Sequence, residues 1–423
     1  MMNLEILQNP KYCILEDGED YVFYNPARHY ACRLTPLDLS IFNLIFKYKH
    51  IDEILTQIPS SYHTYIINIY NLVEKYKVLD TDPVVDPQLI SYCIPNTYYI
   101  HLTYTCNLNC SYCYNKSVRK SLKELTVKQW EQILDKILPY AKKIVLTGGE
   151  PFLYKKLSQI ITYIKKVNTE IIIELISNCM VDFETYENIE RIFDNIDAVV
   201  FSCDNMSDVN QPRKNFNVDK FKKNISYVKS NHPNLHITIS SVYSNGSRNE
   251  QCLICDYCKH MDVSFRSVLV VPGTPDETSL LPPLEEYNSS LKRGNQEIPN
   301  LRMHCGAGIG ILSVNPQGDL FPCQSLMSSE YWIGNLNENS IEELMEEEIV
   351  ASIRESFCVE NIPICRNCNL RYLCAAGCRA ATLNTEGSPS AYPEKLCKYY
   401  KAKQYNILRS IPKFSEINQI ILE

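Results

Sequence analysis

The sequence predicts an α/β protein with three domains. Residues 98–271 alternate short β-rich runs with amphipathic helical patterns, which is typical of βαβ units and a parallel sheet. Three short strands and three helices are predicted before this region, and the chain after it is dense in cysteine with little periodicity. At 423 residues, the chain is also long enough to bury two or three separate cores.

Composition favours a cytoplasmic protein that binds metal. Apolar residues make up 45% of the chain and charged residues 22%, and no run approaches the roughly 20 apolar residues that a membrane span needs. The net charge of −7, with both signs interspersed, provides no basic footprint for nucleic acid and no polybasic patch for a membrane. Residues 1–10 lack the pattern of a secretory signal. In a reducing cytosol, 19 cysteines indicate metal binding rather than disulfides.

The first domain is predicted to span residues 1–82. Strands are expected at 12–16, 20–24 and 29–34, with an Asp17-Gly18 turn between the first two. Thr35 is a suitable N-cap, with Pro36 at the first helical position and Asp38 three residues after the cap. Further helices are expected at 51–58 and 61–76. This order predicts a small winged-helix-like α+β module, closed by a linker at residues 80–87.

The second domain, residues 95–275, is predicted to contain six parallel strands. They cover residues 98–105, 143–147, 171–177, 198–203, 236–242 and 264–271, with a helical pattern in each gap. Six such units predict a parallel α/β sheet. Ligands of parallel α/β folds bind at the carboxyl ends of the strands, and four of the six strands are followed by a recognisable feature.

The first of these features is the loop of Cys106, Cys110 and Cys113, with the spacing CxxxCxxC. Three thiolates can hold three irons of a 4Fe–4S cluster and leave the fourth open to another ligand. This loop resembles the signature of the radical S-adenosylmethionine (SAM) superfamily. The resemblance implies that the six units of the second domain take the form of a partial, TIM-like (β/α)6 barrel. It also implies that the open iron binds SAM, whose cleavage yields a 5′-deoxyadenosyl radical that takes a hydrogen atom from the substrate. Tyr112 matches the aromatic position near the adenine.

The features after the other strands complete this resemblance. The second strand is followed by two glycines, which allow close approach of a ligand, and by a carboxylate that can accept bonds from an ammonium group. Together they resemble the family's GGEP motif for the SAM amino group; the residues are Gly148, Gly149, Glu150 and Pro151. An ordinary tight turn is the alternative.

Two further segments are similar to SAM-binding positions of the family. Ser177 and Asn178 follow the third strand, but Cys179 stands where the family usually has glycine. After the fourth strand, Ser202 lies in a Ser-x-Asp segment, and Arg213 could pair with the SAM carboxylate through its planar guanidinium. The alternative for both is a solvated loop residue. Asp204 and His101 are possible proton acceptors, although each could be an ordinary polar residue near a strand end.

The third domain, residues 301–400, contains seven cysteines whose order resembles the SPASM domain. They are Cys305, Cys323, Cys365, Cys368, Cys374, Cys378 and Cys397. The resemblance implies two auxiliary iron–sulfur clusters, although CxxC pairs also suit zinc. A helical tail is predicted at residues 401–423.

The resemblance assigns these cysteines to two sets. The distal set is Cys365, Cys368, Cys374 and Cys397, and the proximal set, nearer the barrel, is Cys305, Cys323 and Cys378. The proximal set is one ligand short, because residues 306–312 contain no cysteine. Cys358 or one of Cys252, Cys255 and Cys258 would complete it; otherwise the proximal cluster has an open iron.

The first domain resembles the precursor-recognition element of many peptide-modifying enzymes. Residues 21–24, 34–36 and 66–79 carry the likeness. It implies that the leader of a precursor peptide adds as a strand to the third strand and packs on the third helix. The alternative is a structural cap on the barrel.

These motifs predict a peptide-modifying oxidoreductase. We expect it to form a thioether or carbon–carbon crosslink in a ribosomally made precursor, with electrons from a donor such as flavodoxin or ferredoxin. The rivals are an anaerobic sulfatase-maturating enzyme, which forms formylglycine, and a noncatalytic iron–sulfur electron carrier. The extra first domain argues against the former, and the SAM-type motifs argue against the latter.

Overall fold

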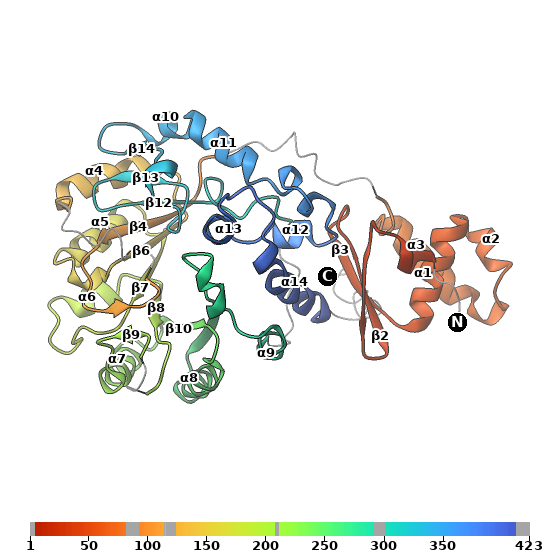
Figure 1. The fold of residues 1–423 in the computed structure, drawn as a ribbon, viewed down its shortest axis with the longest axis horizontal. Coiled ribbons are helices and arrows are strands. Elements are labelled where there is room, and N and C mark those ends of the chain that lie inside the picture. Colours follow the sequence, from red (N-terminus) through yellow and green to blue (C-terminus); the bar gives the residue numbers. More distant parts are fainter. Residues whose placement is uncertain are drawn as a thin grey trace.

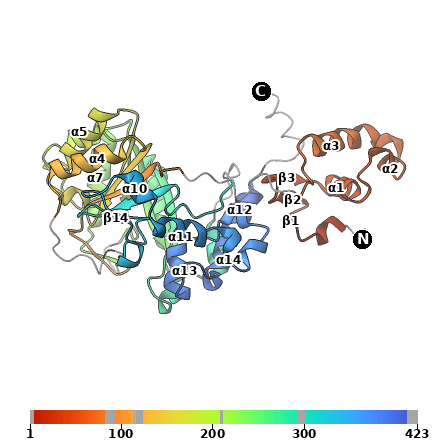
Figure 2. The ribbon, with the colours of Figure 1, turned by 90° about the horizontal axis from the view of Figure 1, so that it is seen from above.

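The protein has three parts that lie in a row. The computed structural model describes residues 5–81, 93–113, 115, 124–207, 211–291 and 301–411. Figure 1 shows the N-terminal module at one end, the large sheet with its helices at the other, and the C-terminal helices between them; Figure 2 shows the same order from above. No helix in the described part of the chain is sufficiently long and apolar to cross a bilayer.

The N-terminal module contains three strands followed by three helices, as predicted. β1 (Cys13–Asp17), β2 (Asp20–Asn25) and β3 (Tyr30–Leu34) form an antiparallel sheet in that order. The helices are α1 (Pro36–Tyr48), α2 (Ile51–Leu55) and α3 (His63–Lys75). The predicted capping box is present, because Thr35 and Asp38 each bond the backbone N–H of the other. Most of the predicted linker at 80–87 lies outside the described residues.

The large sheet has nine strands, and all six predicted strands are among them. These six are consecutive and parallel: β4 (Thr97–Thr103), β6 (Lys143–Gly148), β7 (Ile172–Ser177), β8 (Ala198–Ser202), β10 (His236–Tyr243) and β11 (Ser264–Leu269). The helices of this region are α4 (Val127–Ile137), α5 (Leu157–Val167), α6 (Ile189–Phe193), α7 (Val218–Asn231) and α8 (Arg248–Met261). A two-stranded sheet of β5 (Asn109–Cys110) and β9 (Arg213–Lys214) lies beside it.

Alternation along the strands separates two faces of the sheet. Tyr98, Ile100 and Leu102 of β4 are fully buried in the apolar core with Trp130 of α4. Successive side chains of a strand point to opposite faces, so Tyr99, His101 and Thr103 face away from this core. The sheet therefore has one face packed on helices and another available to line a site.

Three strands of the C-terminal region extend the sheet, and the sequence did not predict them. β12 (Ile311–Val314) pairs parallel with β4, and β13 (Asp319–Phe321) and β14 (Gly334–Asn335) follow in antiparallel pairing. These strands have two to four residues, which is too short for alternation to be recognisable in the sequence. The C-terminal region is therefore joined to the sheet by backbone hydrogen bonds as well as by the chain.

The described part of the chain after β11 also contains five α-helices of four to nine residues and one of 16 residues, α14. They are α9 (Leu284–Ser290), α10 (Ile341–Met345), α11 (Glu348–Ser356), α12 (Arg371–Cys374), α13 (Arg379–Glu386) and α14 (Glu394–Arg409). α14 begins before Cys397 and runs through the start of the predicted tail; residues 412–423 lie outside the described part.

The N-terminal module is docked on this C-terminal region. Val22 and Tyr24 of β2 pack against Leu373 of α12 and Leu408 of α14 in one apolar cluster. On β3, Arg33 donates from Nη2 to Asp17 Oδ2 at 2.8 Å and to the Arg409 carbonyl at 2.6 Å. Both apolar and polar contacts therefore fix the position of the module.

Candidate active site

The loop of residues 106–113, here called the cluster loop, follows β4 and is held by a second strand. β5 lies inside the loop and pairs with β9, with Cys110 opposite Arg213. Burial raises the pKa of the Cys110 thiol, Arg213 lowers it, and the neighbouring thiols of Cys113 and Cys106 raise it. Three thiols thus gather at the carboxyl end of one strand, an arrangement that fits a 4Fe–4S cluster held by three cysteines.

The two glycines after β6 pack against the end of β4. A Cβ atom at Gly148 would lie 2.2 Å from the Thr103 carbonyl oxygen, and one at Gly149 would lie 2.2 Å from that of Thr105. The Gly149 N–H donates to Thr103 at 2.7 Å, and the Glu150 N–H donates to Thr105 at 2.8 Å. The glycines are therefore needed for contact with the protein's own backbone, next to the cluster loop, whereas the sequence suggested contact with a ligand.

Glu150 is a fully buried carboxylate that links two of the motifs. It accepts hydrogen bonds from the Phe152 N–H at 3.2 Å, the Ser177 hydroxyl at 2.9 Å and the Asn178 N–H at 2.7 Å. Burial raises the pKa of Glu150 to about 7, although these three bonds lower it. Pro151 begins the short helical turn Pro151–Leu153 directly after it.

Asn178 connects the loop after β7 to the cluster loop. Its side-chain N–H groups donate to Asn107 Oδ1 at 2.7 Å and to Cys106 Sγ at 3.6 Å. The next residue, Cys179, has a φ of +65°, a conformation that glycine adopts without strain. The requirement for this conformation explains why glycine suits the position, and Cys179 adopts it with its side chain fully buried.

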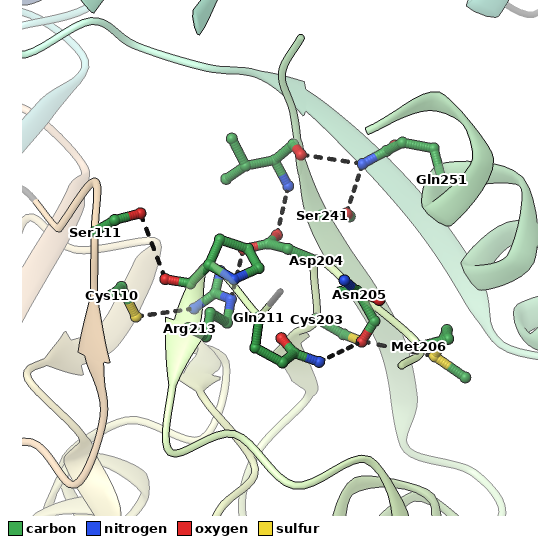
Figure 3. Close-up of polar contacts among 12 residues, drawn as sticks. Cys110, Ser111, Cys203, Asp204, Asn205, Met206, Gln211, Arg213, Ser241 and Gln251 are labelled. Atoms are coloured by element: carbon green, nitrogen blue, oxygen red, sulfur yellow. Dashed lines mark hydrogen bonds and ion pairs between the residues drawn. The ribbon is translucent and has the colours of Figure 1, made fainter. Parts of the chain in front are cut away.

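Arg213 lies beside the cluster loop, as Figure 3 shows, and it is paired with Asp204. Arg213 Nε donates to Asp204 Oδ2 at 2.7 Å, and Nη1 lies 4.0 Å from Cys110 Sγ. The guanidinium carbon is 5.7 Å from the centre of the Tyr112 ring. Ser202 is the last residue of β8, at the same edge of the sheet. The sequence predicted Arg213 but gave no sign of this partner.

Four of the C-terminal cysteines line one small cavity. Cys365, Cys368, Cys374 and Cys397 surround a volume of about 40 Å³. Burial raises the pKa of Cys374 to about 12, and the neighbouring thiols of Cys368, Cys397 and Cys365 raise it too. These are the four cysteines assigned to the distal set.

The other three line a larger cavity next to it. Cys305, Cys323 and Cys378 surround about 320 Å³, and Cys374 and Tyr400 line both cavities. Two cysteines considered as a fourth ligand lie elsewhere. Cys358 packs in an apolar cluster with Met303 and Cys365, and Cys258 packs in the core of the large sheet. The residues that line the larger cavity include none of the four candidates, Cys252, Cys255, Cys258 and Cys358.

Two sequence profiles match the chain. That of the radical SAM superfamily matches residues 100–250, and that of SPASM, an iron–sulfur cluster-binding domain, matches residues 305–369. The sporulation killing factor maturation protein SkfB of Bacillus subtilis is 33% identical over 95 residues, which are 22% of this chain and 23% of SkfB.

Solved structures share the fold at low sequence identity. Native anSMEcpe with bound AdoMet aligns with a TM-score of 0.61 and 18% identity, over 77% of this chain and 99% of its own. SuiB of Streptococcus suis bound to the precursor peptide SuiA aligns with a TM-score of 0.58 and 15% identity, over 92% of this chain and 99% of its own.

The two profiles cover the cluster loop, residues 148–151 and the start of the cysteine-rich region. The second profile describes an iron–sulfur domain, which favours iron–sulfur clusters over the zinc alternative. The chain therefore belongs to the radical SAM superfamily and is an enzyme with a C-terminal SPASM domain, whose cofactors are SAM, a 4Fe–4S cluster and auxiliary iron–sulfur clusters.

Proposed function

We propose that this enzyme uses radical SAM chemistry to form a thioether or carbon–carbon crosslink in a ribosomally made precursor peptide. The likeness to SkfB, a maturation protein, supports a peptide substrate, and so does the fold shared with SuiB, which was solved with a precursor peptide bound. The SuiB fold covers 92% of this chain, against 77% for anSMEcpe. The observation that carries the proposal is the arrangement of the N-terminal module.

β1 and β3 are the two edge strands of this module, and both contact the C-terminal region. Cys13 of β1 and Ala31 of β3 join the apolar cluster with Leu370 and Leu373, and Arg33 of β3 also bonds the Arg409 carbonyl. β3 pairs with β2 on one side and has no strand partner on its other side within the described residues. An extended peptide can add to such an edge through backbone hydrogen bonds. We propose that the leader of the precursor binds there, against α3.

The position of the module does not favour the alternative of a barrel cap. Figures 1 and 2 show the module at the opposite end of the molecule from the large sheet. Its described contacts go to the C-terminal region, including a hydrogen bond from Asn369 Nδ2 to the Tyr12 carbonyl at 2.6 Å. The module is therefore held at a fixed position relative to the auxiliary clusters, which suits an element that delivers a substrate.

The residues around the cluster loop suit SAM. The ionised Glu150 can accept hydrogen bonds from the SAM ammonium, Arg213 can donate to its carboxylate, and Tyr112 can contact the adenine. Ser177, Asn178 and Ser202 lie at the same edge of the sheet. When bound, the 4Fe–4S cluster supplies the electron that cleaves SAM to the 5′-deoxyadenosyl radical.

Neither proton acceptor suggested by the sequence suits that role. Burial lowers the pKa of His101 to about 3, so its imidazole is neutral and weakly basic. Asp204 is almost fully buried and its charge is paired with that of Arg213, while its other oxygen accepts the Val242 N–H. We therefore propose that another group acts as the base.

β4 has the cluster loop at its carboxyl end and Tyr99, which interacts with a proximal cysteine, near its other end. Tyr99 faces away from the helix-covered core. Burial raises the pKa of Tyr99; Glu174 raises it, Arg266 lowers it, and Cys323 of the proximal set raises it as well. We propose that the peptide crosses this face of the sheet, between the radical and the proximal cluster.

The larger cavity suits a proximal cluster that also binds the substrate. Its volume is about 320 Å³, whereas the cavity lined by all four distal cysteines measures about 40 Å³. The three thiols of the proximal set line it, together with Cys374 of the distal set and the cationic residues Arg302 and Lys403. We propose that a cysteine thiolate of the precursor completes the iron ligands here, which would orient its sulfur for bond formation.

Binding of the leader is expected to protect one edge strand of the module. Hydrogen exchange of the full-length protein should slow in the backbone of β3 when a synthetic leader peptide is added, because an added strand bonds the outer N–H groups. β1, the other edge strand, serves as the matched control, because its exchange should not change when a leader adds to β3. Equal exchange in β3 with and without a leader that binds would place the leader elsewhere.

A further inference from the structure

The ion pair between Asp204 and Arg213 has a geometry beyond what binding of SAM requires. The two side chains are only 3% and 12% exposed, and Asp204 is fixed at both oxygens. Oδ1 accepts the Val242 N–H of β10 at 2.7 Å, while Oδ2 accepts Arg213 Nε at 2.7 Å. Asp204, two residues after β8, therefore anchors the arginine to the frame of the large sheet.

The arginine in turn faces the cluster loop, as Figure 3 shows. Its Nη1 lies 4.0 Å from Cys110 Sγ, and its own strand pairs with the strand of Cys110. Ser111, the next residue, donates its N–H to the Pro212 carbonyl at 3.0 Å. The carboxylate thus lies on the far side of the guanidinium, and the positive end of the pair points at a ligand thiol.

A fixed positive charge at this place has an electrostatic effect on an iron–sulfur cluster. Charge and hydrogen bonds around the sulfurs set the reduction potential, and a nearby cation favours the reduced, more negative form. Burial strengthens the effect because little water screens it. The same arginine also lies at the place predicted for the SAM carboxylate.

We propose that Asp204 is a positioning residue of the SAM cluster: it holds Arg213 beside Cys110, and this raises the reduction potential of the cluster and keeps Arg213 in place for SAM. The hydrogen bonds of Asp204 go to Arg213 and to the Val242 N–H, so it acts on the cluster and on SAM through Arg213. The proposal rests on the three-cysteine cluster of the cluster loop and is independent of the peptide substrate.

The sign of the change in the Asp204→Asn variant tests the proposal. Asparagine keeps an oxygen for the Val242 N–H but has no charge to hold Arg213. Loss of a negative charge alone would raise the reduction potential of the cluster. If Asp204 acts by holding Arg213, the guanidinium moves away and the potential falls instead, toward that of Arg213→Gln.

The measurement is a redox titration of the electron paramagnetic resonance signal that changes when SAM is added, in protein with wild-type iron content. We expect a lower potential in Asp204→Asn and in Arg213→Gln, and no further fall in the double variant. SAM affinity of Asp204→Asn should decrease about tenfold or more, as is typical for residues that support a metal site. The conservative variant Asp204→Glu keeps the negative charge. It should recover part of the reduction potential and part of the SAM affinity.

Asp197→Asn provides a matched control at the other end of the same strand. Asp197 precedes β8, and its Oδ2 accepts the Ile173 N–H at 2.8 Å and Lys165 Nζ at 2.9 Å. Like Asp204, it accepts bonds from a strand N–H and from a cationic side chain, but it lies at the opposite end of β8 from the cluster loop. The reduction potential of the cluster should therefore not change in Asp197→Asn. A potential that is equal or higher in Asp204→Asn, or unchanged in Arg213→Gln, would overturn the proposal.

Discussion

Replacing Cys106, Cys110 and Cys113 together with alanine is expected to abolish 5′-deoxyadenosine formation while the C-terminal iron remains. The three thiols gather at the end of β4, whereas the other seven predicted ligands line two cavities in a separate region. The protein should therefore lose one cluster without losing the others. Deoxyadenosine is measured by chromatography after incubation with SAM and a chemical reductant, and iron is counted per chain.

The control for this experiment is Cys252→Ala. Cys252 is an exposed cysteine on α8, so its removal should change neither iron content nor deoxyadenosine. If the triple variant still produced deoxyadenosine, the assignment of the cluster loop would be wrong.

The Glu150→Gln variant is expected to bind SAM about 10 to 100 times more weakly, because a hydrogen bond to a charged group contributes about 1.5–3 kcal/mol. Glutamine keeps the shape of the side chain but cannot offer a carboxylate to the SAM ammonium. The raised pKa of Glu150, about 7, also makes wild-type binding depend on pH. Since the ionised carboxyl is the form that binds, affinity should rise severalfold from pH 6 to pH 8; the rise is limited because the SAM α-amino group, with a pKa of about 8, begins to lose its proton in the same range.

Stability without SAM should change in the opposite direction over the same range. A carboxyl group whose folded-state pKa is raised stabilises the fold while protonated, and this contribution is lost as the pH rises through the folded-state value. From pH 6 to pH 8, the unfolding free energy should fall by about 1 kcal/mol through Glu150. Calorimetry of the wild type and of Glu150→Gln, as binding curves and as unfolding curves, measures how SAM affinity and unfolding free energy change with pH. If Glu150→Gln kept the wild-type pH dependence of SAM binding, Glu150 would not be the group responsible.

The sequence predicted the elements that repeat or that begin with a distinct local signal. The six parallel strands were found because each is an apolar run between helical patterns, and the start of α1 was found because Thr35, Pro36 and Asp38 form a local signal. The cysteine spacings also survive as local patterns. Within the cluster loop and within residues 365–378 the spacing is short, so it predicted thiols that lie near one another. The resemblance to SPASM, and not spacing, implied the proximal set and the place of Cys397 in the distal set.

Contacts between distant parts of the chain were not predicted. The pairing of Asp204 with Arg213 requires the end of β8 to lie beside β9 and β10. The bond from Asn178 to Cys106 joins the loop after β7 to the loop after β4. The close approach of Gly149 to Thr105 likewise depends on the packing of two loops. None of these has a signature in the residue types alone, since many pairs could meet.

In the C-terminal region, the short length of the strands and the dependence of cavity volume on distant residues limited the predictions. β12 to β14 are too short to show a period, so the extension of the sheet appears only when its pairing with β4 is seen. The difference between the two cysteine-lined cavities could not be predicted either, because the space around a site depends on residues such as Arg302 and Lys403 from separate segments.

Mass spectrometry of the peptide shows whether the enzyme forms the proposed crosslink in a precursor. The candidate is a short open reading frame encoded beside this gene, incubated anaerobically with the enzyme, SAM and a reductant. We expect the peptide to lose two hydrogen atoms for each deoxyadenosine formed, only when its leader is present, and fragmentation to locate a bond between two residues. An aldehyde at a single residue, or an unmodified peptide despite deoxyadenosine formation, would contradict it.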